Sequence, residues 1–442
     1  MTRSPRDEAI AAIADALGDR QLVWFGIRGH DASPLMAIPQ FRFCFAITAP
    51  LRAGSLDRST TLEELTGERV DLDTYDIDLD TRDEVQQLRR LVMGSLQRRS
   101  AVATYRPSGF IDAIRYANLG MALHLGMFKE RQRPFEFKPW VETRLREEGV
   151  ATIPWDYVAD ERRSTVATRV EEDGPVVLRP SRNSGGVGIA LVRTAGEVDE
   201  LWPAQGEQFV GVAPFLSDAL PLNVGGVVFA DGTVRLHPGS VQLIGIDLCT
   251  ERPFGYCGND FAAFAELDDA LVAEVDRSSR RVGSWLASEG YRGAFGVDFL
   301  VHRGMVYFSE VNARFQGSTS LSSQLSAEAG HRDLLIDHVA AFLGLDPGPD
   351  RSLGQWAAEV GTAAHIVVHQ SSGVATAALD WADAGTPTYW RREIVADREI
   401  TVRPGGVSIR LVGPGPITKN GYELEADAVA AVRTVTPAAR SI

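Results

Sequence analysis

A β-hairpin with acidic side chains inside its strands constrains this chain more than any other segment. Two apolar strands at 296–301 and 305–311 are joined by a short turn at 302–304. Elsewhere, short strands rich in Val, Phe and Leu alternate with helical patterns and turns. A mixed order of this kind, with antiparallel hairpins, predicts a combination of α/β and α+β structure.

Three oxygen-bearing side chains interrupt the hairpin. Glu310 and Asn312 are two residues apart, so they point to one face of their strand. Asp298 joins that face if the turn has an odd number of residues or a bulge at Gly304, whereas a regular two-residue turn would place it opposite Ser309. Buried acids without partners are costly and repel one another, so we expect these residues to bind a divalent cation such as Mg²⁺. For the hairpin taken alone, a solvated polar face is the alternative.

Arg314 follows Asn312 by two residues and precedes a Ser-Thr-Ser run at 318–320 that is typical of a helix start. Arginines and helix N-termini both favour anions. Beside a metal site, Arg314 therefore suits a transferring phosphoryl group. A surface salt bridge is the alternative interpretation of this residue.

A glycine-rich loop joins predicted strands at 176–178 and 189–192. It has neither the lysine nor the following helix of a Walker-type P-loop, and it is not a dinucleotide fingerprint. We expect a hairpin whose glycine amides form an anion-binding concavity over phosphates, with Arg179 at its root. Its expected phosphate-covering residues are Ser184, Gly185, Gly186 and Gly188. A plain surface hairpin is the alternative.

Length and charge limit the classes of protein that fit. The 442 residues suggest roughly three domains. We expect an N-terminal α/β domain at 1–127, a domain at 128–345 with a lid at about 151–212, and a small C-terminal α+β domain at 346–442. Lys plus Arg is 45 against 59 for Asp plus Glu, a net charge of −14 that disfavours nucleic acids and anionic membranes. Three cysteines and no long apolar run indicate a cytoplasmic protein without a membrane span.

In this order, the motifs resemble those of the ATP-grasp superfamily of carboxylate-amine ligases. Lys138 begins a helix that ends at Gly149, and Pro154 follows, as in the entry to that fold. Arg179 and the glycine loop resemble its basic residue and phosphate lid, and the run from Asp298 to Arg314 resembles its metal signature. The resemblance covers about 135–343. Less specifically, residues 24–29 and the size of the C-terminal part resemble peptide ligases of the pheganomycin-biosynthesis type.

The resemblance implies an ATP-grasp fold that binds ATP and Mg²⁺, preceded by a pre-ATP-grasp domain. Asp298, Glu310 and Asn312 would hold Mg²⁺, and Lys138 and Arg179 would neutralise the α- and β-phosphates. Arg314 and Arg179 would be the catalytic residues, and we expect Arg179→Lys to be tolerated better than Arg179→Ala. Ala213 and Phe215 would form the adenine hinge, and Asp218 is the candidate for the ribose.

Three departures from the family pattern concern the nucleotide. Arg179 stands where the family usually has lysine, and its planar guanidinium donates in a different geometry from an ammonium group. The hinge at Ala213 lacks the usual acidic residue, and Pro214 has no N–H to offer adenine. Asp218 is only a weak match to the ribose-binding acid.

The implied reaction forms an amide or peptide bond through an acylphosphate. The expected substrates are a small carboxylic acid and the amine of an amino acid or peptide, in antibiotic or other peptide natural-product biosynthesis, and a homodimer is a family expectation. We expect Ser240–Asp260 to be a long binding loop, and Arg28 either to receive a substrate carboxylate or to be solvated. The alternatives are a carboxylase-type enzyme that activates bicarbonate, a kinase that stops at the phosphorylated product, and a non-catalytic nucleotide-binding module.

Overall fold

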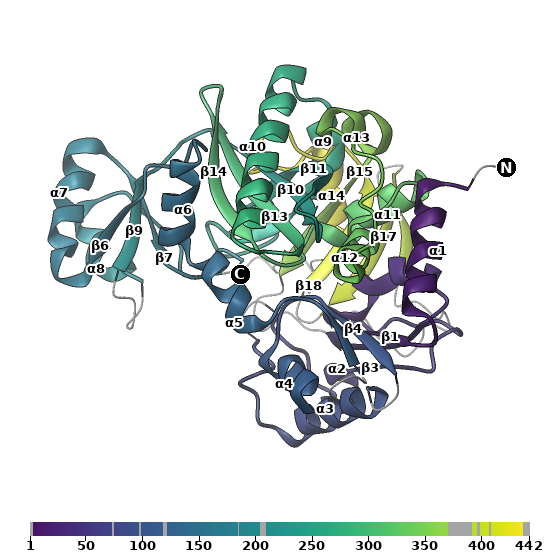
Figure 1. Cartoon of the computed structure of the whole chain (residues 1–442). Helices are drawn as coiled ribbons and strands as arrows, with labels where there is room; N and C mark the ends of the chain where they lie inside the picture. The colour runs from purple at the N-terminus through teal and green to yellow at the C-terminus, as the bar shows by residue number, and fades with distance from the viewer. Residues whose placement is uncertain are drawn as a thin grey trace.

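A computed structural model of the chain contains three β-sheets with helices packed against them (Figure 1). It describes residues 3–72, 75–96, 99–117, 122–183, 185–203, 209–369, 391–395, 398–405 and 408–435. Within these ranges, none of the helices has the length and apolar character needed to cross a membrane.

The N-terminal sheet has five parallel strands in the order β3-β2-β1-β4-β5. The strands are β1 (Gln21–Arg28), β2 (Phe41–Thr48), β3 (Arg58–Thr61), β4 (Ser100–Thr104) and β5 (Ala122–Leu125). In β1, Leu22 and Trp24 belong to one buried core and Val23 and Phe25 to another, because the sheet is covered on both faces. The strand order reverses between β1 and β4, the place where open α/β sheets form ligand sites.

The central sheet has nine strands in the order β14-β13-β10-β11-β12-β15-β18-β17-β16, and all neighbouring pairs are antiparallel. Its strands are β10 (Leu220–Val228), β11 (Val234–Ile244), β12 (Tyr256–Asp260), β13 (Gly293–His302), β14 (Met305–Asn312), β15 (Ala363–His369), β16 (Arg391–Val395), β17 (Arg398–Gly405) and β18 (Ser408–Pro414). Because β12 pairs with β15, the sheet continues across the domain boundary expected at residue 346.

A smaller four-stranded sheet forms the lobe at the left of Figure 1. Its antiparallel strands are β6 (Asp156–Ala159), β9 (Phe209–Pro214), β7 (Val176–Pro180) and β8 (Ala190–Val192), in that order. Helices α7 (Arg163–Asp173) and α8 (Val198–Leu201) share the buried core of this lobe. The lobe covers nearly the same residues as the lid expected at about 151–212, and its role as a lid stays a prediction.

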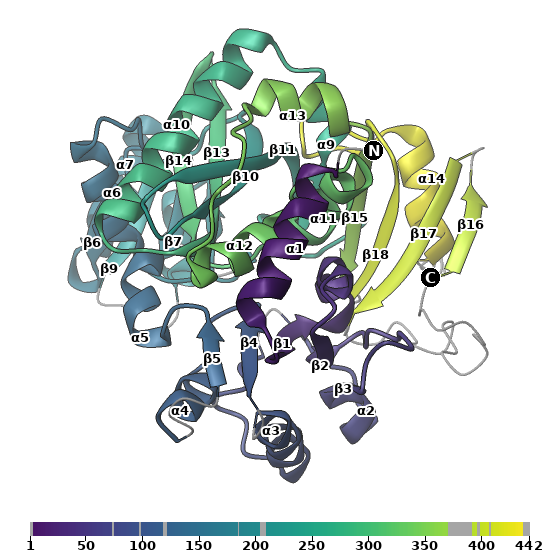
Figure 2. The same cartoon turned by 45° about the vertical axis from the view of Figure 1, so that its right-hand side comes forward.

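The remaining helices connect and cover the two large sheets. Val228 of β10 belongs to the core shared with α10, and Val227 to the core shared with α12, so these helices cover opposite faces. Helix α1 packs against α12 (Figure 2). The bounds are α1 (Pro5–Leu17), α2 (Leu62–Thr66), α3 (Asp83–Ser95), α4 (Gly109–Ala117), α5 (Lys129–Gln132), α6 (Lys138–Glu147), α9 (Phe261–Ala265), α10 (Asp269–Ser288), α11 (Thr319–Glu328), α12 (Leu334–Leu343), α13 (Leu353–Val360) and α14 (Ala426–Val435).

The turn between β13 and β14 is the regular two-residue kind. Its central residues, Arg303 and Gly304, have φ of 50° and 76°, as a type I′ turn requires. Of the two alternatives left open by the sequence, the turn is therefore the regular one, without a bulge at Gly304. Counted from this turn, Asp298 would face Ser309.

Asp298 nevertheless faces Glu310, because β14 contains one extra residue further along. The pairing is regular as far as Phe299 with Phe308 and then shifts, so that Ser309 has no opposite residue in β13. Ser309 is therefore the extra residue of a β-bulge. The bulge turns both carboxylates to the same face, as the metal hypothesis needs.

The expected long loop at Ser240–Asp260 is wrong in its bounds. Strand β11 continues to Ile244 and β12 begins at Tyr256, so the loop covers only 245–255. The sequence pattern does not predict the full length of β11, because Pro238 and Gly239 are both uncommon inside strands. The structure accommodates them with a shift of register against β10.

Candidate active site

A cavity of about 310 Å³ lies where the lid, the central sheet and the N-terminal sheet meet. Most of the residues selected from the sequence line it: Arg179, Gly185, Gly186, Ala213, Phe215, Asp298, Glu310, Asn312 and Arg314. Lys138, Gly188 and Asp218 are not among the lining residues. Ser184 falls outside the described residues.

Asp298 and Glu310 form a pair of acids on the floor of this cavity. Asp298 accepts hydrogen bonds from the side-chain amides of Asn223, at 2.6 Å, and Asn312, at 3.2 Å. Burial, and then the neighbouring Glu310 carboxylate, raise the pKa of Asp298 to about 7. Two acids held together in this way favour a cation between them.

Sequence reasoning missed a buried amide network behind the acids. Asn223 donates to Gln316 at 2.7 Å and accepts from the Ser318 hydroxyl at 2.8 Å. Gly296 makes room for this network, since a Cβ atom there would lie 1.5 Å from the Gln316 amide nitrogen. Asn223 offered a signal, because it is the one polar side chain within the apolar strand β10.

Lys138 contacts the acid pair although it does not line the cavity. It is the first residue of α6, and its Nζ lies 3.4 Å from Oε2 of Glu310, with only 6% of its side chain exposed. Burial lowers the pKa of this ammonium group. Its main-chain N–H donates to the Ser181 carbonyl at 3.2 Å, which connects α6 to the start of the glycine loop.

Arg179 forms its ion pair and hydrogen bonds with other residues of the protein. Its guanidinium is ion-paired with buried Glu142, and it donates to the Tyr157 hydroxyl at 3.2 Å and to the Ser309 carbonyl at 3.1 Å. The Arg179 guanidinium also lies 3.7 Å from the centre of the Trp155 ring. Burial lowers the pKa of Arg179. The residue therefore joins the lid to the bulge that orients Glu310.

The glycine loop bends over the cavity toward the loop before β12. Gly185, Gly186 and Gly188 all have positive φ, between 60° and 77°. A Cβ atom on Gly186 would lie 2.1 Å from the main-chain oxygen of Phe254. Only glycine permits both this backbone conformation and this close approach.

The expected adenine hinge lines the cavity, and one of its main-chain N–H groups is already hydrogen-bonded within the protein. Ala213 is buried in β9, and Phe215 follows it with 38% of its surface exposed. The Phe215 N–H donates to the Pro175 carbonyl at 2.9 Å. Asp218 is exposed, with φ of 58°, and its charge acts on Tyr422, a cavity-lining residue.

Arg314 places a positive charge near the acid pair. Its Nη1 donates to the Phe315 carbonyl at 3.1 Å, and its Nε lies 3.4 Å from a carboxylate oxygen of Glu136. Its guanidinium also acts electrostatically on Asp298. Arg314 is therefore placed to contact the anionic part of a ligand whose cation is held by the acid pair.

The acid pair fits a cation that shares its ligands with a substrate. Among the residues that the structure describes, no three His, Cys, Asp or Glu side chains gather as a complete metal cage. Mg²⁺ is bound by one or two carboxylates together with substrate phosphates and water. Asp298 and Glu310, with the amide of Asn312 beside them, are a donor set of this kind.

Comparison with known proteins identifies the fold of this region. Residues 138–318 match the family described as the ATP-grasp domain. The formate-dependent phosphoribosylglycinamide formyltransferase of Synechococcus sp. (strain CC9311) is 29% identical over 52% of this chain and 56% of its own length. The same-named protein of Haloquadratum walsbyi is 30% identical over 48% of this chain and 50% of its own length. The chain thus spans about half the length of the curated relatives it matches.

Solved structures extend the likeness to nearly the whole chain. The biotin carboxylase domain of Hydrogenobacter thermophilus 2-oxoglutarate carboxylase, in complex with MgADP, ADP and bicarbonate, has a TM-score of 0.56 at 13% identity over 90% of this chain and 86% of its own. Carboxyaminoimidazole ribonucleotide synthase of Aspergillus clavatus, complexed with ATP, has a TM-score of 0.55 at 14% identity over 90% and 94%.

The fold and the matched family agree with the expectation from the sequence. The chain has the ATP-grasp fold, and residues 138–318 match the ATP-grasp domain family.

Proposed function

We propose that this protein is an ATP- and Mg²⁺-dependent ligase that activates a carboxylate as an acylphosphate and joins it to an amine. The observation that carries the proposal is the facing pair of Asp298 and Glu310, with Lys138 3.4 Å from Glu310, beneath the glycine loop of an ATP-grasp lid. The relatives are formate-dependent by name, and formate is the simplest carboxylate.

The residues divide the reaction between them. Mg²⁺, when bound by Asp298, Glu310 and Asn312, would neutralise charge on the β- and γ-phosphates. A carboxylate oxygen of the substrate attacks the γ-phosphorus, and the bond from this phosphorus to the β–γ bridging oxygen breaks, releasing ADP. The amine nitrogen then attacks the acyl carbon, phosphate leaves, and the nitrogen loses a proton. Arg314 would stabilise the negative charge in both steps.

Arg179 has a changed role in this proposal. Its bonds to Glu142, Tyr157 and Ser309 make it a positioning residue for Glu310, while Lys138 places its ammonium group 3.4 Å from the Glu310 carboxylate. The glycine loop would exclude water, because an acylphosphate exposed to solvent hydrolyses.

The finer assignment is a peptide ligase of the pheganomycin-biosynthesis type, acting in antibiotic biosynthesis. It is supported by the resemblance of residues 24–29, of which Ile27 and Arg28 line the cavity, and by the C-terminal strands that complete the central sheet. A homodimer, a cytoplasmic location and amino acid or peptide substrates remain predictions.

The test is ADP release with mass spectrometry of the products. We would incubate the protein with ATP, Mg²⁺ and a panel of small acids, amino acids and short peptides, with and without a candidate amine. An amide product formed with one ADP per bond supports the ligase. ADP release without an amine supports a kinase, ADP release that requires bicarbonate supports a carboxylase, and no turnover with any acid supports a binding module.

A further inference from the structure

A second group of side chains, two arginines and two tyrosines, lines the same cavity, and the proposed roles above do not use it. Arg28 ends β1, Tyr105 follows β4, Tyr256 begins β12, and Arg410 lies within β18. These four residues come from the N-terminal sheet and from the central sheet with its C-terminal strands. The cavity therefore receives positive charge from parts of the chain that are far apart in sequence.

The charge of one carboxylate, Asp31, acts on both arginines of this group. Arg28 is paired with Asp31 through its Nε at 3.0 Å. Arg410 is only 6% exposed, and within the described part of the chain its Nη1 has no hydrogen-bond partner. Burial, and then the Arg28 guanidinium, lower the pKa of Arg410, and Asp31 is the one carboxylate among the groups that act on it most strongly. Arg28 is therefore paired, whereas no carboxylate among the described residues forms an ion pair with Arg410.

A buried charge without a partner is costly, because the interior of a protein solvates it poorly. Guanidinium groups also bind carboxylates through two parallel hydrogen bonds, and Arg410 has a donor in place for this. The excess of one positive charge corresponds to one carboxylate better than to a phosphate dianion. Because the described residues do not supply this partner, a monoanionic ligand of the cavity would complete the site.

The position of the group in the fold supports a ligand independently of its charge. Arg28 and Tyr105 lie at the carboxyl ends of β1 and β4, between which the strand order of the N-terminal sheet reverses. Ligands of open α/β sheets bind at this point. The Arg28 guanidinium lies 5.8 Å from the centre of the Tyr105 ring, so the two side chains form one surface of the cavity.

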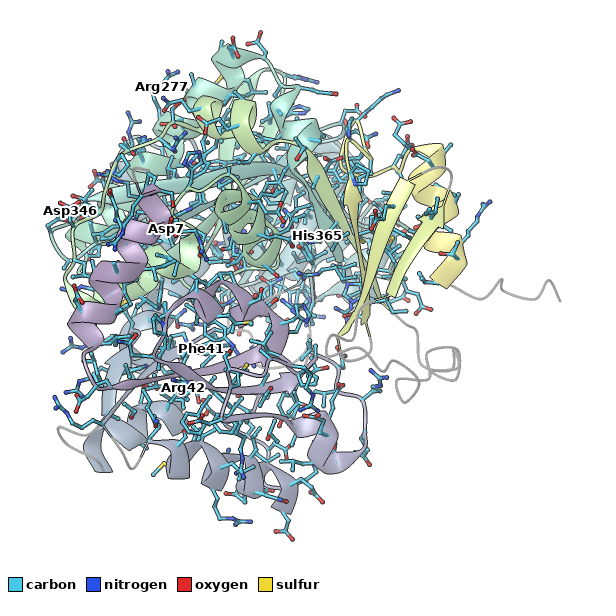
Figure 3. The ribbon with its side chains drawn as sticks, turned by 90° about the vertical axis from the view of Figure 1, so that its right-hand side faces the viewer. Asp7, Phe41, Arg42, Arg277, Asp346 and His365 are labelled. Atoms are coloured by element: carbon cyan, nitrogen blue, oxygen red, sulfur yellow. The ribbon has the colours of Figure 1, made fainter. Side chains whose placement is uncertain are left out.

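Tyr256 connects this group to the acid pair. Its hydroxyl donates to Asn259 and lies 2.9 Å from Nε2 of His365, which is labelled on β15 in Figure 3. The charges of Arg28, Arg410 and Asp298 all act on this hydroxyl. Because both groups line the same cavity, one small molecule bound in it can contact both.

We propose that Arg28 and Arg410 bind a second carboxylate of the substrate, one that is not activated. The substrate held here is an amine that carries a carboxylate, such as an amino acid, or a dicarboxylic acid. This inference rests on the proposed function for the identity of the reacting end. It adds the chemical class of the other end.

Thermal unfolding of the full chain tests the site, with succinate as the probe and sodium chloride at matched ionic strength as the reference. The variants are Arg410→Met, Arg410→Lys and the control Arg277→Met, whose side chain is exposed on α10 (Figure 3). We expect succinate to raise the melting temperature of the wild type and of Arg277→Met, less that of Arg410→Lys, and not that of Arg410→Met.

Without added anion, Arg410→Met should melt no lower than the wild type, because it removes an unpaired buried charge. We also measure kinetics with a substrate that carries the second carboxylate and that the wild type converts. The KM for this substrate should rise at least about 30-fold in Arg410→Met, with a smaller change in kcat. Equal succinate shifts in the wild type and Arg410→Met, or none in the wild type, would overturn the inference. If Arg410→Met does not fold, a full succinate shift in Arg410→Lys would count against it.

Two further probes separate the possible failures. A larger shift with inorganic phosphate than with succinate, lost in Arg410→Met, would overturn the carboxylate in favour of a phosphate group. MgADP should raise the melting temperature of the wild type and of every variant. Absence of the MgADP shift in the wild type, with the succinate shift retained, would refute the proposed function and leave the carboxylate site standing.

Discussion

The Arg179 guanidinium donates a hydrogen bond from Nη1 to the main-chain carbonyl of Ser309, 3.1 Å away, and so connects the lid to the bulge of β14. The bulge leaves this carbonyl outside the regular pairing with β13, and Arg179 supplies the donor. The next residue, Glu310, faces Asp298 because of the same bulge.

We expect Arg179→Met to destabilise the protein by about 3–5 kcal/mol, because it leaves Glu142 buried without its ion partner. The double variant Arg179→Met/Glu142→Gln should recover most of this loss. Urea unfolding followed by tryptophan fluorescence measures it, since Trp155 stacks on Arg179. Equal losses in the single and double variants would show that the ion pair is not the cause.

Arg179→Lys should retain more activity than Arg179→Ala and still lose about tenfold or more in kcat/KM for ATP. An ammonium group keeps the charge, but it cannot reproduce a planar set of bonds to three partners. Steady-state ADP release checks this prediction. Wild-type rates in Arg179→Lys would mean that the charge alone matters.

Glu310→Ala should abolish ADP release, with a loss of at least about a hundredfold, while the chain remains folded. Removal of this carboxylate takes its repulsion away from Asp298 but leaves the buried Lys138 without its ion partner, so the metal-free variant should stay folded and melt lower than the wild type. The measurement pairs ADP release with thermal unfolding. Near-normal turnover in a folded Glu310→Ala protein would refute the metal assignment.

Gly186→Ala should raise KM for ATP about tenfold or more, because the added methyl group would meet the Phe254 carbonyl and strain a residue with φ of 77°. Gly196→Ala is the matched control in the same lobe, since its Cβ position has no atom within 4 Å. Initial-rate kinetics over a range of ATP concentrations would test the pair. Identical KM values in the two variants would mean that the glycine loop does not close on ATP.

Stability should fall in mild acid because of His338. This ring lies between the two large sheets, where its Nδ1 accepts from the Ala294 N–H and its Nε2 donates to the Leu125 carbonyl, each at 3.0 Å. Burial lowers the pKa of His338 to about 4. Between about pH 6.5, the usual pKa of histidine, and pH 4, the unfolded chain binds a proton at this residue and the folded chain does not. The contribution of His338 to the free energy of unfolding is therefore complete above pH 6.5 and is lost as the pH falls to 4.

The loss from this one histidine would amount to about 3 kcal/mol across that range. Urea unfolding at several pH values between 4 and 7.5 measures it. His338→Gln should be less stable than the wild type at pH 7.5 and should show a flatter dependence on pH. A wild-type slope in the variant would assign the acid sensitivity to other groups.

The sequence was most informative where the chemistry is local. The spacing of Glu310 and Asn312 predicts one shared face, and the hairpin strands follow from apolar patterns. The position of Asp298 could not be settled, because a bulge at Ser309 depends on its partner Arg179, 130 residues away. The extent of β11 was hidden by Pro238, which local rules exclude from strands.

The charged group of Arg28 and Arg410 shows what no local pattern contains. Arg28 was a candidate carboxylate receptor, but its partner in β18 lies nearly four hundred residues later and became visible only with the sheet order. Glu142 was hidden for the same reason, since nothing within α6 marks it as the partner of Arg179.

The pairing of β12 with β15 limits how this protein can be shortened. A chain cut at the Pro- and Gly-rich linker near 344–350 would keep the residues matched to the ATP-grasp family but would leave the hydrogen-bonding groups of β12 at an open edge. Such an edge recruits other strands and promotes aggregation. Engineering of a minimal catalytic unit should therefore retain the C-terminal strands, although they lie outside the matched region.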